Sequence, residues 1–295
     1  MMVLPRWRWP RSIPMPISAT TTKTSRFRAY AIAKAARNRK SSGALRAIAL
    51  LVAAFAFLPG GCASTSLAPS VTAQQATIER NDSRAVGSAD NAESVGLVDA
   101  QSLAPGLQLD IRYAGSDNFV GAPIDGYHAP RCLLLRPAAQ ALARVERDLR
   151  TQGLRLRVFD CYRPMRAVRH FVRWAADLED QASKPIYYPR LDKRELLGDY
   201  IAPTSGHSRG ATVDLTLERC DGATCAPLDM GTPFDFFDSR ANTDAADVTA
   251  LQRGNRDRLR AAMQREGFRN YPLEWWHYTL QPEPSPGRYY DVPVR

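Results

Sequence analysis

The chain has 295 residues and a formal net charge of +10, and hydrophobic residues make up 44% of the sequence. The positive charge belongs to one end: residues 1–61 contain eleven Lys or Arg and no acidic residue, whereas the remainder carries 29 basic and 30 acidic residues. A nucleic-acid-binding domain needs its basic surface in the folded region, so this distribution excludes nucleic acid as the expected partner.

Residues 1–61 have the organisation of a secretory signal. A basic stretch leads into Ala44 to Leu58, which is apolar except for Arg46, and small residues precede Cys62. A basic region, an apolar region of about a dozen residues and small residues before the cleavage point define such a signal. The apolar stretch is shorter than the ~20 residues that a membrane span needs. We therefore expect the chain to be exported to the periplasm or the cell surface.

Cys62 follows Pro59, Gly60 and Gly61 and stands where a bacterial lipoprotein carries its lipid. Proline occupies the place where such sequences usually have leucine, so ordinary cleavage and a retained anchor stay open beside lipidation. The following residues are rich in Ser, Ala, Thr, Asn and Gln, a composition that cannot bury enough apolar surface to fold. We predict an export leader, a flexible tether and one folded domain, at 1–61, 62–95 and 96–295.

The first half of the folded domain is predicted to contain three strands and two helices. The strands cover 107–113, 133–135 and 154–160, and the helices cover 137–151 and 165–179. Leu107 to Tyr113 alternates apolar and polar residues, as half-buried strands do. Pro137 suits the first position of its helix, and Gly153 lies just beyond the end.

The second half is predicted to contain a loop, two strands and one long helix. These cover 181–204 with one helical turn, 212–217 and 273–280 for the strands, and 247–266 for the helix. Five apolar residues of this helix are expected to face inward: Val248, Leu251, Leu259, Ala262 and Met263. The pattern indicates an α+β domain in which helices pack against an antiparallel sheet.

Four cysteines lie in the folded domain, and an even number in an exported domain permits two disulfides. Cys220 and Cys225 enclose a short hairpin-like loop and form the first predicted pair. Cys132 and Cys161 remain as the second pair. A single Cys-x4-Cys is a poor metal motif, so we interpret all four cysteines as structural.

Two short motifs, Ser-x-His-x6-Asp and Glu-x-Trp-His, contain residues with metal-binding chemistry. His207 precedes a glycine bend and Asp214 lies in the following strand, while Glu274 and His277 come about sixty residues later. Two histidines and one carboxylate are a usual set of protein ligands for catalytic zinc, with the fourth position left for water. We predict one zinc ion per chain, bound by His207, Asp214 and His277, with Glu274 as the base that takes a proton from the water.

The spacing of Glu274 and His277 constrains the local backbone. Residues three apart lie on opposite faces of a regular strand. A helix would bring them together, but the sequence Trp-Trp-His-Tyr-Thr-Leu favours a strand. Both side chains can reach one metal ion only if the strand kinks or bulges beside Pro272.

The motifs of the folded domain together resemble those of the zinc D-Ala-D-Ala peptidases, most closely the VanX-type D-alanyl-D-alanine dipeptidases. The resemblance covers roughly 100–295. Besides the two metal motifs it includes Asp-Asn-Phe at 117–119, Asp-x-Tyr-Arg-Pro at 160–164 and Met-Gly-x-x-Phe-Asp at 230–235. One departure is Thr212, where a small alanine is common in the family. The resemblance implies an α+β fold of the D-Ala-D-Ala peptidase and Hedgehog-like type, with the zinc site on its antiparallel sheet.

The resemblance also implies roles for residues outside the metal motifs. Arg163 would stabilise the negative charge that develops on the scissile carbonyl. Asp235 would hold the ammonium group of a dipeptide, and Tyr113 and Ser205 would line the pocket. The expected partner is therefore a small D-amino-acid dipeptide.

These observations predict zinc-dependent hydrolysis of D-alanyl-D-alanine, linked to cell-wall peptide metabolism. One rival is a D,D-carboxypeptidase or endopeptidase acting on peptidoglycan peptides through a more open pocket. Another is a non-catalytic, zinc-bearing module that binds the cell wall. Glu274 and Arg163 argue against the module, because a structural zinc site needs neither a spare base nor an oxyanion partner. The sequence leaves the oligomeric state open.

Overall fold

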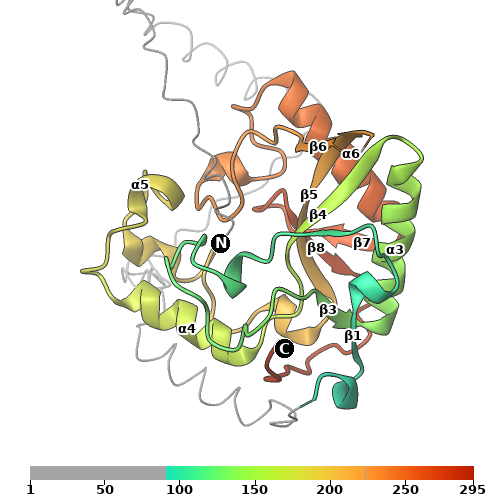
Figure 1. Ribbon diagram of the computed structural model, residues 1–295. Helices are drawn as coiled ribbons and strands as arrows, with labels where there is room; N and C mark the ends of the chain where they lie inside the picture. Colours follow the sequence, from blue (N-terminus) through green and yellow to red (C-terminus); the bar gives the residue numbers. More distant parts are fainter. Residues whose placement is uncertain (1–90, 223) are drawn as a thin grey trace, which may run out of the picture. The chain divides into compact units, whose positions relative to one another are not determined.

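A six-stranded β-sheet forms the centre of the described part of the chain, residues 91–222 and 224–295 of a computed structural model (Figure 1). The strand order is β2-β4-β5-β8-β7, and β6 pairs with β5. The strands are Gln108–Leu109 (β2), Leu154–Asp160 (β4), Thr212–Asp221 (β5), Thr224–Pro227 (β6), Phe268–Asn270 (β7) and His277–Leu280 (β8). Neighbouring strands are antiparallel except β2 and β4, which are parallel. The predicted antiparallel sheet is therefore confirmed except at its β2 edge.

Helices and a small second sheet complete the α+β architecture. The α-helices are Arg136–Arg150 (α3), Met165–Ala176 (α4), Lys184–Tyr187 (α5) and Ala250–Arg265 (α6). Short 3-10 helices cover Glu93–Val95 (η1), Ala100–Ser102 (η2), Arg112–Ala114 (η3), Lys193–Leu196 (η4), Gly206–Arg209 (η5) and Ser239–Ala241 (η6). The second sheet pairs Leu97–Asp99 (β1) with Leu133–Leu135 (β3).

The two faces of the central sheet have different chemistry. Helices α3 and α6 pack together on one side of it, whereas α4 and α5 lie on the other (Figure 1). Along β5, alternate residues Val213, Leu215 and Leu217 are fully buried and apolar. The residues between them point to the opposite face, because side chains alternate along a strand. That opposite face carries Asp214, so it is the face on which a polar site can form.

The predicted helices are present, with ends set by local contacts. α3 matches its prediction to within one residue at each end. α4 ends at Ala176, three residues early, and the carbonyl of Asp177 accepts a hydrogen bond from the buried Lys193 Nζ at 2.7 Å. α6 begins at Ala250 because Thr249 and Gln252 form a capping box, in which each side chain accepts a hydrogen bond from the other's backbone N–H.

Two of the five inward positions predicted for this helix are wrong, because Val248 lies before the first residue of α6 and Leu251 is exposed. Leu251 lies in the first turn and is 69% exposed, whereas Leu259, Ala262 and Met263 are buried as expected. Arg256 is instead completely buried, and its guanidinium donates hydrogen bonds to the carbonyls of residues 230, 240 and 242. A charged side chain with three carbonyl partners can replace an apolar one inside the domain, because its donors are satisfied.

The predicted strand over 107–113 is mostly wrong. Only Gln108 and Leu109 pair with β4, which bulges between Val158 and Asp160. The chain then leaves the sheet edge and forms η3, which contains Tyr113. Leu107, Ile111 and Tyr113 are all buried, so the alternation identified the buried residues correctly but not the backbone conformation.

The export leader, Cys62 and all but the last five residues of the tether lie outside the described residues. Within the described ranges, no helix is both long and apolar enough to cross a membrane. Both predicted disulfides are present, Cys132–Cys161 and Cys220–Cys225.

Candidate metal centre and active site

Strand register brings three polar residues side by side on one face of the sheet. Asp160 of β4 lies opposite Asp214 of β5, and Asp214 lies opposite His277 of β8. Directly opposite residues in a sheet have Cβ atoms only about 4.5–5.5 Å apart. The hydrogen-bonded backbone therefore places two carboxylates and an imidazole in contact, although 62 residues separate Asp214 from His277 along the chain.

His207 reaches the same point from the turn that precedes β5. The Ser205 hydroxyl accepts a hydrogen bond from the His207 backbone N–H at 3.2 Å and caps η5. Gly210 ends η5 with a φ of 75°, and a Cβ there would lie only 2.9 Å from Leu97 Cδ2. Glycine tolerates a positive φ and has no Cβ that would clash with Leu97, so it is the residue that fits this position. The turn therefore fixes where His207 enters the site.

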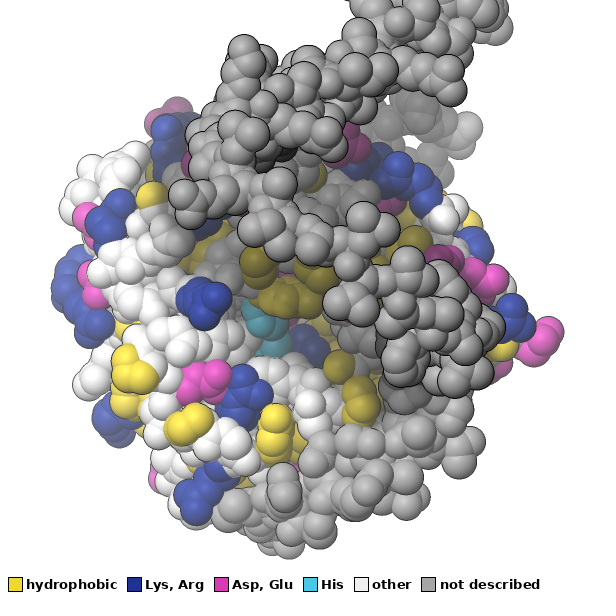
Figure 2. All heavy atoms as spheres, turned by 180° about the vertical axis from the view of Figure 1, so that it is seen from behind, with side chains coloured by type: hydrophobic (Ala, Val, Ile, Leu, Met, Phe, Trp, Pro, Cys, Tyr) yellow, Lys and Arg dark blue, Asp and Glu magenta, His cyan; other side chains and the backbone are white. Residues whose placement is uncertain are grey.

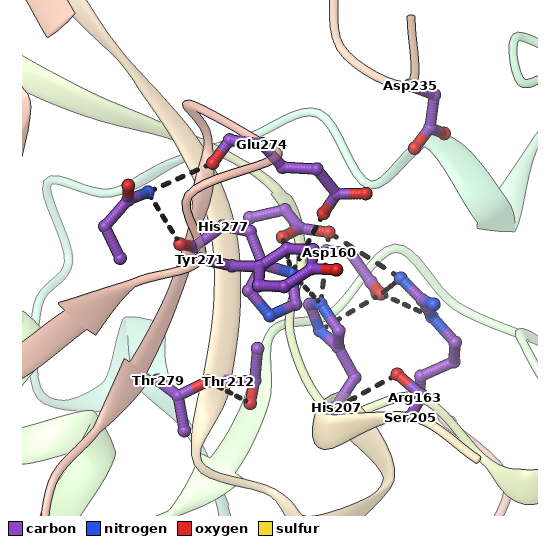
Figure 3. Close-up of polar contacts among 12 residues, drawn as sticks. Asp160, Arg163, Ser205, His207, Thr212, Asp235, Tyr271, Glu274, His277 and Thr279 are labelled. Carbon is purple, nitrogen blue, oxygen red and sulfur yellow. Dashed lines mark hydrogen bonds and ion pairs between the residues drawn. The ribbon is translucent and has the colours of Figure 1, made fainter. Parts of the chain in front are cut away.

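The ligand atoms of His207, Asp214 and His277 converge on one point. They all lie within 4.8 Å of one another, and Figure 3 shows the two imidazoles directed toward each other. His207 Nε2 is 3.2 Å from Asp214 Oδ2 and 3.3 Å from His277 Nδ1. Asp214 Oδ1 is buried, and it lies 3.1 Å from His277 Nδ1. Two imidazole nitrogens and a buried carboxylate that faces both of them are a donor set that fits a divalent metal ion.

The electrostatics of the three residues are coupled. Burial alone would raise the pKa of the Asp214 carboxyl, but His207 and His277 hold it below its usual range. Burial alone would lower the pKa of His277, but the Asp214 carboxylate, with a smaller contribution from Glu274, raises it to about 9. A proton and a metal cation therefore compete for the same position between these side chains.

Glu274 approaches the cluster from a turn rather than from a strand. The predicted strand over 273–280 is wrong for its first four residues: Glu274 N–H donates to the Tyr271 carbonyl and His277 N–H donates to the Glu274 carbonyl. Asn270 Nδ2 closes this turn by donating to the carbonyls of Glu274 and His277. The Glu274 Oε2 atom then lies 3.3 Å from His277 Nδ1. This turn is the kink that Glu274 and His277, three residues apart, need in order to reach one metal ion.

Arg163 enters the pocket from the β4–α4 junction. Its guanidinium donates to Asp160 Oδ2 from both Nε and Nη2, at 3.0 and 2.9 Å, and Nη2 is 3.6 Å from Asp214 Oδ2 (Figure 3). The same group lies about 5 Å from the ring centres of Tyr113 and Phe171. Carboxylates on one side and aromatic faces on the other fix the guanidinium in a single orientation.

Asp235 and Tyr113 form a second polar group in the pocket. The Tyr113 hydroxyl donates to Asp235 Oδ2 at 2.9 Å, and Asp235 is only 6% exposed. Burial, and secondarily the negative charge of Asp214, raises the pKa of the Asp235 carboxyl well above its usual range. Asp235 also has a φ of 58°, which is uncommon for a residue with a side chain. A buried carboxyl group in a strained conformation is a candidate for binding a cationic group.

All eight residues predicted for the metal and the substrate line one pocket of about 310 Å³. They are Tyr113, Arg163, Ser205, His207, Asp214, Asp235, Glu274 and His277. The 181–204 segment reaches this pocket through residues 198–202 and 204. Figure 2 shows histidine side chains at the bottom of a hollow with hydrophobic and basic groups around it.

The structure adds two residues to which the sequence analysis gave no role in the site. Asp160 is fully buried, lies 3.4 Å from His207 Nδ1 and accepts a hydrogen bond from Tyr127 as well as from Arg163. Its place in the Asp-x-Tyr-Arg-Pro motif could have revealed it. Tyr271 lines the pocket with its ring 5.5 Å from that of His277, and no sequence pattern pointed to it.

Comparison with known proteins agrees with this geometry. A family model described as D-ala-D-ala dipeptidase matches residues 93–295. The D-alanyl-D-alanine dipeptidase of Enterococcus faecium is 41% identical over 202 residues, which cover 68% of this chain and 99% of the relative. The enzyme of the same name from Streptomyces coelicolor is 42% identical over 193 residues, 65% of this chain and 95% of the relative. That of Escherichia coli is 34% identical over 62% of this chain and 84% of the relative. The chain therefore belongs to the D-ala-D-ala dipeptidase family of metallopeptidases.

Proposed function

We propose that this protein hydrolyses free D-alanyl-D-alanine, and that it does so with one zinc ion held by His207, Asp214 and His277. The observation that carries the proposal is the convergence of these three ligand atoms within 4.8 Å, in a pocket that also contains Glu274 and Arg163. Zinc in such a site supplies Lewis-acid activation of water and of the substrate carbonyl. The donor set of two imidazoles and one carboxylate supports zinc over the harder cations, which prefer oxygen ligands.

Glu274 acts as the general base and then as the general acid. Its carboxylate reaches the edge of the ligand cluster without being one of the three converging ligands, so it is free to take a proton from the attacking water. It returns a proton to the leaving amine when the peptide bond breaks. Proton transfer by a positioned group typically contributes about 10²–10⁴-fold to the rate.

Arg163 stabilises the negative charge that forms on the scissile carbonyl oxygen. Its guanidinium lies beside Asp214 and is held in place by Asp160, so the charge is available without rearrangement. A preorganised donor of this kind is worth about 10²–10³-fold in kcat. Neither Glu274 nor Arg163 is needed by a zinc site that only supports structure, which disfavours the non-catalytic wall-binding module.

Asp235 restricts the substrate to a free dipeptide. The buried carboxylate, bonded to Tyr113, is a partner for the ammonium group of the substrate. In an N-acylated peptide a neutral amide takes the place of that ammonium, so the Asp235 carboxyl group, whose pKa is raised by burial, has no cation to pair with. Truncating one partner of a buried charge pair costs about 2–5 kcal/mol. This favours the dipeptidase over a carboxypeptidase or endopeptidase acting on longer wall peptides.

We further propose that the protein works outside the cytoplasm, linked to cell-wall peptide metabolism, with Cys62 as the point of lipid attachment. The basic and apolar leader over 1–61 supports export, and disulfides are typical of proteins from oxidising compartments. Mass spectrometry of the membrane fraction tests the anchor: a diacylglyceryl group on an N-terminal Cys62 is expected, and a mature chain that begins elsewhere would refute it.

The activity is tested by incubating the zinc-loaded protein with D-Ala-D-Ala, L-Ala-D-Glu and N-acetyl-D-Ala-D-Ala and measuring free amino acids. Free amino acids should appear from the first substrate only. The Glu274→Gln variant, loaded with the same amount of zinc, is the control for contaminating peptidases. Equal release from the N-acetylated compound would support the carboxypeptidase, and no release from any of the three would overturn the proposed activity.

A further inference from the structure

The short strand β3 supports both halves of the metal site. Cys132, immediately before β3, forms the disulfide with Cys161, which directly follows β4. The Leu133 carbonyl accepts a hydrogen bond from the Tyr162 N–H at 2.9 Å. Two residues later, the Leu135 N–H donates to the Gly210 carbonyl at 2.7 Å. One strand is thus connected to the turn that carries Arg163 and to the turn that carries His207.

The Cys161 carbonyl oxygen contacts the His207 ring directly. It lies 2.7 Å from Nδ1, the shortest contact of that nitrogen, while Asp160 Oδ2 is 3.4 Å away. A carbonyl can only accept a hydrogen bond, so Nδ1 carries the proton and donates it. Nε2 then keeps its lone pair and faces Asp214 and His277. The Cys161 carbonyl therefore selects the tautomer that can bind a metal ion through Nε2.

The disulfide is well placed to fix that carbonyl. Cys132 and Cys161 are 0% and 1% exposed, so the bond lies inside the domain, and the carbonyl of one of its two residues contacts the histidine. The same short turn, 160–163, carries Asp160 on one side of Cys161 and Arg163 on the other. The Arg163 N–H donates to the His207 carbonyl at 3.3 Å, so the two turns also bond to each other.

We propose that the Cys132–Cys161 disulfide is a positioning element of the active site, which holds the Cys161 carbonyl against His207 and thereby raises the affinity of the site for its metal ion. This inference rests on the proposed ligand set His207, Asp214 and His277. It gives the disulfide a role beyond closing a loop of the chain. Partners that orient a metal-binding histidine are typically worth about 10- to 100-fold in metal affinity or activity.

The second disulfide provides a matched control. Cys220 and Cys225 face each other at the far end of the β5–β6 hairpin. From Asp214 to Cys220 the strand runs six residues, about 20 Å at about 3.3 Å per residue. Removing the Cys220–Cys225 bond also removes a covalent link from the unfolded chain. Neither cysteine contacts a metal ligand in the described structure.

The experiment compares two double variants of the full chain, Cys132→Ala with Cys161→Ala, and Cys220→Ala with Cys225→Ala. Zinc affinity is measured by competition with a chromophoric chelator, and thermal stability by circular dichroism. Both variants should melt at a lower temperature than the wild type. The first should bind zinc about 10- to 100-fold more weakly, whereas the second should stay within about twofold of the wild type. Activity of the first should be low at limiting zinc and should recover with excess zinc.

Because two alanines leave space in the core, Cys132→Ala with Cys161→Val serves as a second variant that restores volume without the covalent bond. A folded variant of either kind with wild-type zinc affinity would overturn the proposal, as would an equal loss of affinity in the Cys220 and Cys225 control. If the proposed substrate is wrong, the wild-type protein will release no D-alanine, and that result is separate from the zinc measurement. The zinc comparison does not depend on that result.

Discussion

Replacing Asp235 by asparagine should convert a selective dipeptidase into a slow and unselective one. The change keeps the side-chain shape and an oxygen that can accept the Tyr113 hydrogen bond, and asparagine tolerates the φ of 58°. What is lost is the negative charge that faces the substrate ammonium. A buried charge pair that loses one partner costs about 2–5 kcal/mol, which corresponds to about 30- to 4,000-fold in kcat/KM at 1.4 kcal/mol per factor of ten.

The assay measures D-alanine release from D-Ala-D-Ala and from its N-acetylated form by wild type and variant. The wild type should prefer the free dipeptide by at least about 10²-fold, because sites built for a polar group reject analogues that lack it. In Asp235→Asn this preference should shrink, mainly because the free dipeptide reacts more slowly. Asp229→Asn changes an exposed carboxylate in the same loop and should keep wild-type selectivity. Unchanged selectivity in Asp235→Asn would refute the assignment of the ammonium site.

The same substitution should stabilise the substrate-free protein at neutral pH. A carboxyl group whose pKa is raised by folding favours the folded state while it is protonated, and it opposes folding once it ionises. The wild type should therefore lose stability relative to Asp235→Asn as the pH rises from about 4, the ordinary pKa of Asp, through the raised value. Melting temperatures measured between pH 4 and pH 8 should diverge in that direction; parallel curves would contradict it.

Three further predictions concern the metal and the reacting groups. Glu274→Gln should keep its zinc but lose about 10²–10⁴-fold in kcat, and loss of zinc on metal analysis would contradict its role as a base. Arg163→Lys should lower kcat by about 10²–10³-fold with a much smaller change in KM, because a lysine cannot reproduce the fixed guanidinium; a change confined to KM would contradict oxyanion stabilisation. Zinc affinity should fall about tenfold per pH unit below pH 9, since the pKa of about 9 means that His277 must lose a proton to bind metal. Chelator competition at pH 6.5, 7.5 and 8.5 checks this, and a flat profile would contradict the raised pKa of His277.

The metal ligands and Glu274 could be named from the sequence because each belongs to a short motif whose residue types have a specific chemistry. His207, Asp214 and His277 were found in this way, and the strand register then explains why they meet. Asp160 was recognised only as the first residue of the Asp-x-Tyr-Arg-Pro motif. Its contacts with His207 and Tyr127 depend on elements that are distant in sequence, and no local pattern reports such contacts.

Backbone conformation was predicted less well where tertiary contacts override local preference. The run Glu-Trp-Trp-His favours a strand by composition, yet Asn270 fixes a turn there, and the Trp275 indole donates to Thr232 at 2.8 Å. Similarly, Arg256 is buried in α6 because it satisfies three carbonyls of the 230–242 loop, a contact that helical periodicity cannot reveal. Leu251 is left exposed on the same helix.

The row of opposed residues across β4, β5 and β8 has a consequence for how sequences of this fold can change in length. Insertion of one residue between His207 and Asp214 would turn Asp214 to the opposite face of β5 and remove it from the site, because side chains alternate along a strand. The 62 residues between Asp214 and His277 are under no such restriction as a whole, since they leave β5, form β6, a loop and α6, and return through β7 to the register Asp214–His277. The spacing between His207 and Asp214 is therefore fixed by geometry. Loops between Asp214 and His277 can change in length without moving either residue. Evolutionary change in chain length should therefore accumulate outside the 230–242 loop, which carries Asp235 and binds the Arg256 guanidinium.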